Sequence, residues 1–503
     1  MNAIGKSYLA CSIAAVLGTG TASALPPTTT PAYTIYAGGG SAEPQPFQVA
    51  VCKLLTNVDS YTDATGGAES GDYKILFGSA SADIGTGATK IPSGSAVLVL
   101  YKFNGGSYVN GAVPQAASGS NLTYPATSVA LAATATGVTL QSACTNTAKN
   151  GAPTYSYTTS ASTATTSQLP AFGITDLEPS AFTGYNLPTT QTPVNPANIV
   201  TAHIYDLVEG VAVTDTLFKV KSRWTSLEIA QVLSGSVSDW SQLSGDSGAP
   251  LTAGPVVLID RNVGSGTKAA GSAFFLGYPG LSGAGLAGTP QSVSGLVGGT
   301  SGCSATYSCY VPTASATFST TYGGYQDIQD GNSTAVVNDL SKANDASMYA
   351  IGILSADNAP YATQNSGHNE FDFVKINGAA MDLSTSTDDI NGTSSTAYDN
   401  VITGGYGFFY QVAFNTRPSF LAGTSPAAEF AAAMKTQLSA DALAGAFSNA
   451  HFPLAAPGIV IDAANDTASH TTGVTIASRG GNSTAPLQLI KKGVTITPAS
   501  DPL

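Results

Sequence analysis

Short apolar runs that end in glycine-rich loops recur along the first half of the chain. Residues 33–36 precede the loop 37–41, and the run 96–102 precedes the loop 104–107. Apolar positions with helical spacing follow the first loop at 47–55. Strand, glycine loop and helix in this order are typical of α/β layers, in which loops at strand ends bind ligands.

The second half of the chain repeats this alternation. A capping box, with Thr225 as the N-cap and Glu228 at the third helical position, marks the start of one helix, and Gly235 ends it. Strands are expected at 172–175, 210–213, 255–259, 349–354, 371–376 and 407–414, and helices at 225–233, 265–276 and 426–447. The pattern as a whole predicts an α/β fold.

One segment does not follow the alternation. Residues 115–168 are rich in Ser, Thr and Ala, with little charge and weak periodicity. We expect short strands and loops on the surface there, and no separate domain.

Composition narrows the choice of partners. Charged residues make up 10% of the chain, against roughly 25% in an average soluble protein. The net charge is −13, and Lys and Arg are not clustered. Nucleic acid and anionic membrane surfaces are therefore poor candidate partners, although a local pocket can still bind a small anion.

The N-terminus indicates export. Residues 1–24 resemble a signal peptide, with Lys6, an apolar stretch at 9–17 and the small residues 22–24, and a Pro/Thr linker follows at 25–32. We expect a periplasmic or extracellular protein without a membrane span in the mature chain. Four cysteines remain, and we pair Cys303 with Cys309 and, by default, Cys52 with Cys144. Sequence alone proves neither pairing.

The most informative local feature is an arginine before a hydroxyl-rich helix start. The strand 255–259 delivers Arg261, and Ser265, Gly266 and Thr267 open the next helix. Hydroxyls, exposed N–H groups and the positive end of a helix suit an oxyanion. The alternative is an ordinary strand–turn–helix corner with a chance arginine, and the motif alone does not decide between them.

Several segments agree, in order, with one family. The loop 37–41 with two following prolines, the run Phe-Gly-Ile-Thr-Asp at 172–176, the helix and tryptophan of 227–240, and Arg-x-x-x-Ser-Gly-Thr at 261–267 carry the resemblance. Together they resemble the phosphate-binding proteins that serve ABC importers, which have the type II periplasmic-binding fold. The resemblance spans most of 33–415 and is dense from 172 to 277.

The resemblance implies a two-lobed α/β fold with loop-rich and β-rich insertions. Lobe 1 would hold 33–200 and 345–503, and lobe 2 would hold 201–344. Phosphate or a similar oxyanion would be the ligand, an ABC transporter a possible partner, and no catalytic residue, metal or cofactor is expected. The implied ligand-binding residues are Ser41, Ser107, Asp176, Arg261, Ser265, Gly266 and Thr267.

Within that set, Asp176 would discriminate between anions. A buried carboxylate accepts a hydrogen bond from hydrogen phosphate and repels a fully ionised sulfate. The alternative is that Asp176 caps a helix that starts at Leu177.

The chain also departs from the family. Val263 stands where an acidic residue is common, so that Asp260 is the residue expected to hold Arg261, and Ala42 replaces an aromatic residue. Two other functions therefore stay open, a phosphoester-handling enzyme and a surface protein with a vestigial site.

A protease-like signal is rejected. Gly245–Pro250 resembles a protease nucleophile loop, but only 44 positions separate His203 from Ser247. That is too short for the two β-barrels of that fold, and a polar turn is expected.

Overall fold

The computed structural model describes residues 29–62, 73–103, 106–116, 119–125, 155–156, 165–182, 186–277, 309–310, 324–358, 370–380, 406–420, 425–443, 459–460, 474–476 and 489–491. The expected signal peptide (residues 1–24), most of the segment 115–168 and most of the chain after 443 lie outside these residues. Predictions for them stay predictions.

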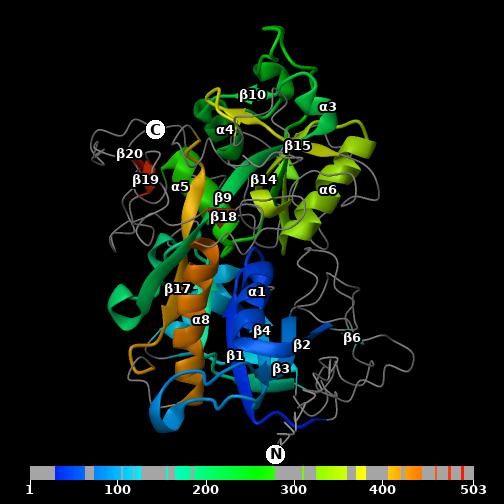
Figure 1. Ribbon diagram of the computed structural model, residues 1–503. Coiled ribbons are helices and arrows are strands. Elements are labelled where there is room, and N and C mark those ends of the chain that lie inside the picture. Colours follow the sequence, from blue (N-terminus) through cyan, green and yellow to red (C-terminus); the bar gives the residue numbers. More distant parts are fainter. Residues whose placement is uncertain are drawn as a thin grey trace, which may run out of the picture.

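The elements form two lobes, one above the other in Figure 1. The first lobe contains β1 (Tyr33–Gly39), β2 (Leu55–Thr62), β3 (Tyr73–Ala80), β4 (Ala96–Lys102), β8 (Phe172–Thr175), β17 (Phe409–Thr416), α1 (Pro44–Leu54) and α8 (Pro426–Leu443). The second contains β11 (Val257–Arg261), β13 (Tyr325–Asp330), β14 (Ala350–Ser355), β15 (Phe371–Phe373), α4 (Ser226–Leu233), α5 (Gly266–Leu276) and α6 (Ser333–Asp345).

Short elements complete the described chain. They are β5 (Leu122–Pro125), β6 (Tyr155–Ser156), β7 (Thr165–Gln168), α3 (Asp215–Phe218), β10 (Arg223–Trp224), β12 (Cys309–Tyr310), β16 (Lys375–Ile376), β18 (Ile459–Val460), β19 (Val474–Ile476) and β20 (Leu489–Lys491).

The first lobe is built around a parallel centre. β1 pairs in parallel with β4 and β8, whereas β3 and β17 run antiparallel to their neighbours. Helices α1 and α8 pack side by side against this sheet (Figure 1). Phe430, Met434 and Leu438 recur every four residues along α8 and are fully buried, so that one apolar face of the helix covers the strands.

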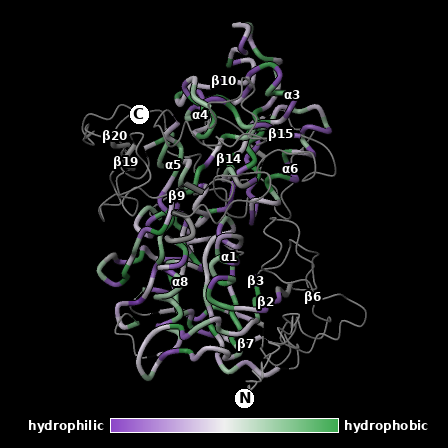
Figure 2. The backbone as a smooth tube through the Cα atoms, viewed as in Figure 1, coloured by the Kyte–Doolittle hydropathy of each residue, from purple (hydrophilic) through white to green (hydrophobic). Residues whose placement is uncertain are grey.

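The second lobe has its own parallel centre. β11 pairs in parallel with β13 on one side and β14 on the other. Val336, Leu340 and Ala343 lie on one face of α6 and are buried against this lobe. Hydrophobic positions, green in Figure 2, accordingly run through the interior of both lobes.

One long strand joins the lobes. β9 (Val200–Thr214) pairs with β17 over residues 200–208 and with β14 over residues 209–213. The prediction of a strand at 210–213 therefore covers only its second half. β14 and β15 pair with β9 in the second lobe, so that residues 350–355 and 371–373 lie there, although we expected them in lobe 1.

Predictions from short sequence motifs match the observed elements most closely. The predicted strand 96–102 is β4, and the capping box of Thr225 and Glu228 is present at the start of α4. Strand β13 and helix α6 were not predicted. The sequence of β13, Tyr-Gln-Asp-Ile-Gln-Asp, is mostly polar although the strand is buried, so that it lacks the apolar run of an interior strand.

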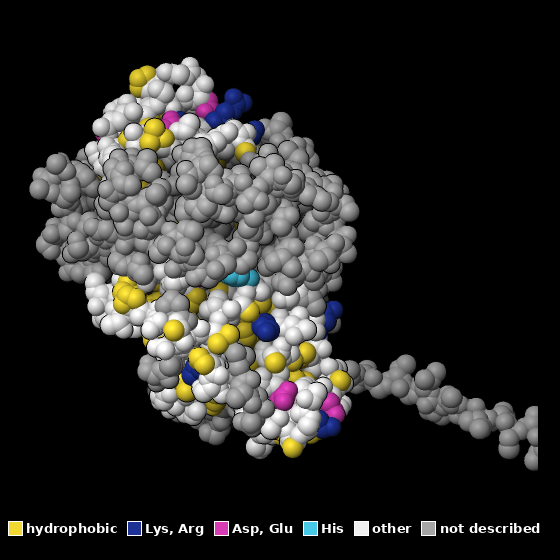
Figure 3. Space-filling view, turned by 90° about the vertical axis from the view of Figure 1, so that its left-hand side faces the viewer, with side chains coloured by type: hydrophobic (Ala, Val, Ile, Leu, Met, Phe, Trp, Pro, Cys, Tyr) yellow, Lys and Arg dark blue, Asp and Glu magenta, His cyan; other side chains and the backbone are white. Residues whose placement is uncertain are grey.

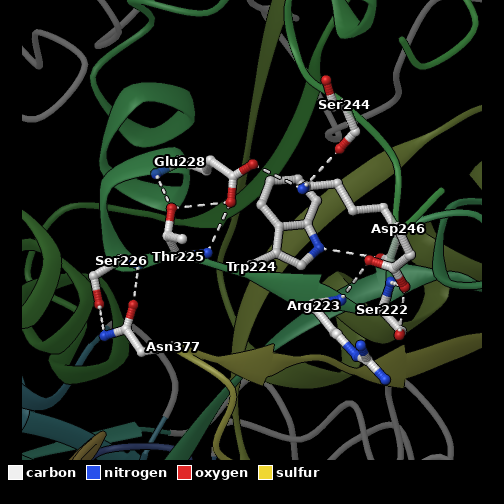
Figure 4. A network of polar contacts seen from close by, with 10 residues as sticks. Ser222, Arg223, Trp224, Thr225, Ser226, Glu228, Ser244, Asp246 and Asn377 are labelled. Atoms are coloured by element: carbon white, nitrogen blue, oxygen red, sulfur yellow. Dashed lines mark hydrogen bonds and ion pairs between the residues drawn. The ribbon is translucent and has the colours of Figure 1, made fainter. Parts of the chain in front are cut away.

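The protease-like loop is a structural turn, as expected. Asp246 accepts hydrogen bonds from the backbone N–H and the hydroxyl of Ser222, at 2.9 and 2.7 Å. Figure 4 shows these contacts beside the capping box of α4, where Lys221 binds Glu228 at 2.8 Å. The network ties the turn to α4 and β10 and contains no catalytic dyad of serine and histidine.

Surface charge, membrane spans and cysteines can also be compared with the predictions. Charged side chains are few on the described surface in Figure 3. Within the described ranges, no helix combines the length and apolar character that crossing a bilayer requires. Cys52 on α1 is disulfide-bonded, but the side chains of Cys144, Cys303 and Cys309 lie outside the description, so that both pairings stay predictions.

Candidate functional site

Arg261 ends β11 and lies between the lobes, with 2% of its surface exposed. Its Nε donates to the carbonyl of Asp330 at 3.3 Å, and its Nη2 donates to the carbonyl of Gly331 at 3.1 Å. Asp330 is the last residue of β13, and Gly331 lies in the turn between β13 and α6. The guanidinium is thus held by backbone oxygens, which fix its direction without neutralising its charge.

The remaining nitrogen of the guanidinium joins the lobes. Nη1 of Arg261 donates to Ser41 Oγ at 3.1 Å and to Ser333 Oγ at 3.0 Å. Ser41 follows β1 in the first lobe, whereas Ser333 begins α6 in the second. The two hydroxyls are 3.4 Å apart. The guanidinium of Arg261 therefore contacts hydroxyl groups from both lobes.

Asp176 approaches the same point from the end of β8. It is 3% exposed. A Cβ on Gly40 would lie 2.5 Å from its Oδ1, and a Cβ on Gly266 would collide with its Oδ2. The carboxylate therefore lies between the loop that carries Ser41 and the first turn of α5, and both close approaches require glycine.

Ser107 belongs to this cluster as well. It is 1% exposed, and its Cβ lies 3.0 Å from the position of a Cβ on Gly40. The next residue, Tyr108, donates its backbone N–H to the carbonyl of Gly264 at 3.1 Å. The second glycine loop of the first lobe is thereby bonded to the turn that follows Arg261.

Helix α5 supplies the third side of the cluster. Ser265 is its N-cap residue, and Ser265 and Thr267 are 2% and 1% exposed. The first N–H groups of a helix lack partners within the helix and carry partial positive charge. They lie beside Asp176, because Gly266 contacts its carboxylate. All seven residues that the sequence singled out therefore lie in or beside one buried cluster.

Two polar atoms in the cluster lack a partner. Oδ1 of Asp176 and Oγ of Ser107 are buried, and neither has a hydrogen bond within the described part of the chain. Each such group costs about 1–3 kcal/mol. An oxyanion that carries a proton would serve both, since it can donate to the carboxylate and accept from the hydroxyl.

Acidic neighbours keep Arg261 charged. Burial lowers the pKa of Arg261, and the carboxylates of Asp176, Asp260 and Asp330 oppose that effect. An arginine is in practice always protonated in proteins. Burial also raises the pKa of Asp330 to about 7, with Asp339 adding to the effect and Arg261 opposing it.

Asp260 does not hold the guanidinium, contrary to our expectation. Its Oδ1 accepts the backbone N–H of Arg261 at 2.7 Å, and its Oδ2 forms an ion pair with Lys268 of α5. Neighbouring residues of a strand point to opposite faces. Asp260 therefore faces α5, while the side chain of Arg261 faces the turn before α6.

The prediction for Asp176 also had an alternative, which is wrong. No helix begins at Leu177, and the short 3-10 helix Pro179–Ala181 has Glu178 at its N-cap position. The carboxylate of Asp176 is free for the site.

Sequence reasoning missed the contribution of the β13–α6 turn. Asp330, Gly331 and Ser333 all bind Arg261, and Asn332 caps α6 by accepting the N–H of Ala335 at 2.9 Å. The sequence analysis assigned no role in binding to this segment. The available signal was an acid and a glycine followed by a hydroxyl that opens a helix, as in the other loops of the site.

Comparison with known proteins gives only distant similarities. No family model matches the chain, and no curated protein matches it. A putative phosphate ABC transporter substrate-binding protein from Clostridium perfringens, with bound phosphate, is 14% identical over 53% of this chain and 72% of its own, with a TM-score of 0.28.

Two further solved structures are similar to the same degree. An ABC-type phosphate transport receptor from Vibrio cholerae is 13% identical over 56% of this chain and 79% of its own, with a TM-score of 0.31. PstS from Borrelia burgdorferi is 10% identical over 49% and 68%, with a TM-score of 0.26. Similarities this low carry no argument about the ligand, for which only the geometry of this chain counts.

Proposed function

We propose that this protein binds a tetrahedral oxyanion, with phosphate favoured, at the cluster around Arg261, and that it performs no chemistry on it. The observation that supports this most is the buried guanidinium with serine hydroxyls from both lobes on one nitrogen. Guanidinium, hydroxyl and helix N–H groups are the donors that oxyanion oxygens require. The ligand-binding residues would be Ser41, Ser107, Asp176, Arg261, Ser265, Gly266 and Thr267.

Asp176 favours phosphate among such anions. Its Oδ1 has no hydrogen bond among the described residues, and an ionised carboxylate can only accept one, so that the ligand has to be the donor. Phosphate keeps a proton at neutral pH, whereas sulfate does not. Sulfate would therefore leave a buried carboxylate facing a second anion, and we expect it to bind much more weakly.

Binding between two lobes suits capture and release. The type II periplasmic-binding fold would close around the ligand by rotation of the lobes, and β9 and β17 run between them in Figure 1. The signal-like residues 1–24 support export to the periplasm or beyond. An ABC transporter that accepts the anion is the partner that such a protein would serve.

The test is calorimetry with phosphate, sulfate and a phosphate monoester on the wild type and on Arg261→Ala. We expect the wild type to bind phosphate at least tenfold more tightly than sulfate. Arg261→Ala should weaken phosphate binding by about a hundredfold, since two or more hydrogen bonds to a charged group are lost. Arg223→Ala, which removes an exposed arginine of the second lobe, is the matched control and should bind like the wild type.

The same titrations separate the other functions. Hydrolysis of the monoester by the wild type would favour the enzyme. If no anion binds and the Arg261 variant behaves like the wild type, the site is structural and the proposal is wrong.

A further inference from the structure

A cavity of about 270 Å³ lies in the first lobe and shares no residue with the Arg261 cluster. Its floor comes from β9 and β17, and one wall comes from α8, which lies beside these strands in Figure 1. Ala202 of β9 pairs directly with Phe414 of β17, and both line the cavity. Val200 and Thr416 form the next such pair. Because alternate positions of a strand share a face, the cavity lies over one regular patch of the sheet.

Small residues of α8 leave this space open. Ala428, Ala431, Ala432 and Lys435 line the cavity, and they are spaced three or four positions apart. Such positions lie on one face of a helix. Three of these four side chains end at Cβ, so that the helix covers the sheet at this point without filling the space between them.

The aromatic wall of the cavity is held in place. Phe420 lines the cavity, and the guanidinium of Arg417 lies over its ring, 5.0 Å from the centroid. Arg417 itself is 7% exposed, and its Nη1 donates to the carbonyls of Pro114 and Pro170 at 3.3 and 2.6 Å. A stacked cation of this kind stabilises the position of a ring. The cavity is therefore formed before any ligand enters, as is usual for ligand sites.

Two charged side chains line the cavity, and they differ in their contacts. The carboxylate of Glu429 accepts hydrogen bonds from the backbone N–H of Thr86 at 3.3 Å and from the hydroxyl of Thr89 at 3.0 Å. Lys435 is partly buried, and among the residues that the structure describes it forms no ion pair and no hydrogen bond. An ammonium group has three donors and no acceptor. The polar group that the cavity offers to a ligand is therefore a cation.

The size and lining of the cavity limit the ligand further. An apolar cavity of roughly 150 Å³ binds one benzene molecule, so that 270 Å³ can hold an apolar group of on the order of ten carbon atoms. The lining is mostly apolar, which disfavours a ligand that is polar throughout. A molecule with an apolar chain and one anionic end fits both the lining and Lys435.

We propose that this cavity is a second ligand site and that it binds an aliphatic carboxylate of medium chain length. The chain would lie against Phe414, Phe420 and the alanines of α8, and the carboxylate would bind Lys435. This site goes beyond the proposed function and does not depend on it, because the two sites share no residue.

The experiment is calorimetry at neutral pH with octanoate, hexanoate and octylammonium on the wild type. Octanoate should bind about fifteenfold more tightly than hexanoate, because each additional buried CH₂ contributes about fourfold. Octylammonium has the same apolar chain and the opposite charge. We expect it to bind at least about tenfold more weakly than octanoate, since it meets Lys435 as a like charge.

Two variants locate the ligand. Lys435→Glu reverses the charge at the cavity and should make octylammonium the preferred ligand. Ala428→Leu fills part of the space and should weaken octanoate binding at least about tenfold. Lys219→Glu, at a lysine of the second lobe that is 71% exposed, and Ala346→Leu, at an exposed alanine after α6, are the matched controls and should bind octanoate like the wild type.

The outcomes decide each part of the proposal. If octanoate does not bind, or binds no more tightly than hexanoate, the cavity takes no aliphatic chain and the inference is wrong. If the wild type prefers octylammonium, Glu429 sets the charge preference and the carboxylate assignment is wrong. Both comparisons use the wild type and decide even if a variant fails to fold. Unchanged octanoate binding by a folded Ala428→Leu variant would place the ligand elsewhere and overturn the inference, whereas phosphate binding at Arg261 would stand.

Discussion

Arg261 and Ser333 lie 72 positions apart in the sequence, and Nη1 of the arginine donates to the serine hydroxyl at 3.0 Å. The same nitrogen binds Ser41 of the other lobe at 3.1 Å. Ser333 therefore contacts the guanidinium from within the second lobe, and Ser41 contacts it from the first.

The first prediction concerns the orientation of the Arg261 guanidinium. Ser333→Ala removes one hydrogen bond to a charged group and leaves the rest of α6 intact, which should weaken phosphate binding about tenfold. Thr334→Ala, one position along the helix, is the control and should bind like the wild type. Calorimetry at neutral pH measures both, and equal affinities for the two variants would show that Ser333 does not position the arginine.

The contact between Gly266 and Asp176 gives a second prediction. A Cβ at Gly266 would collide with the carboxylate, whereas a Cβ at Gly254 would meet nothing within 4 Å. Gly266→Ala should therefore displace Asp176 or hold the lobes apart, and reduce phosphate affinity at least tenfold. Gly254→Ala should leave the affinity unchanged. Normal binding by Gly266→Ala would mean that Asp176 is not confined by the start of α5.

The sequence singled out residues that the fold brings together around Arg261, but it missed one partner of the arginine and misassigned another residue. Asp176 and Arg261 each follow an apolar strand, and their order along the chain pointed to one cleft. Ser333 was not predicted because β13 buries polar side chains, so that no apolar run marks the strand before it. Asp260 was assigned to the wrong partner because charge alone suggested Arg261, whereas strand alternation turns it toward Lys268.

The assignment of strands to lobes could not be predicted from local sequence either. The strand predicted at 349–354 corresponds to β14, but its place in the second lobe depends on pairing with β9 and β11, which are distant in sequence. The periodicity of apolar residues indicates which face of a strand is buried, but it does not indicate which other strand pairs with it.

A third prediction concerns the ion pair behind the site. Lys268 and Asp260 are both buried. Burial works against the charge of Lys268, yet Asp260 and Asp327 outweigh it and leave the pKa of Lys268 above its ordinary value. Lys268→Met leaves the buried carboxylate of Asp260 without its ion-pair partner and should lower the free energy of unfolding by about 3–5 kcal/mol.

The control for that substitution is Lys219→Met. Lys219 is 71% exposed and faces Asp215 at 3.7 Å, and an exposed pair of this kind contributes at most about 1 kcal/mol. Urea unfolding at neutral pH compares the two variants. Similar losses for both would mean that the pair between Lys268 and Asp260 contributes no more than a surface pair.

The last prediction is the pH dependence of stability. Asp59 on β2 is buried, and within the described part of the chain neither carboxylate oxygen has a hydrogen bond. Burial raises its pKa from 3.8 to about 6. The folded state thus binds this proton more tightly than the unfolded state, so that the carboxyl favours folding at acidic pH and destabilises the fold as the pH rises from about 4 to above 6. Asp59→Asn cannot ionise, and its stability relative to the wild type should rise over that range by up to about 3 kcal/mol. Thermal unfolding of both proteins at pH 4.5 and pH 8 measures this difference, and a constant gap between them would show that Asp59 titrates normally in the folded protein.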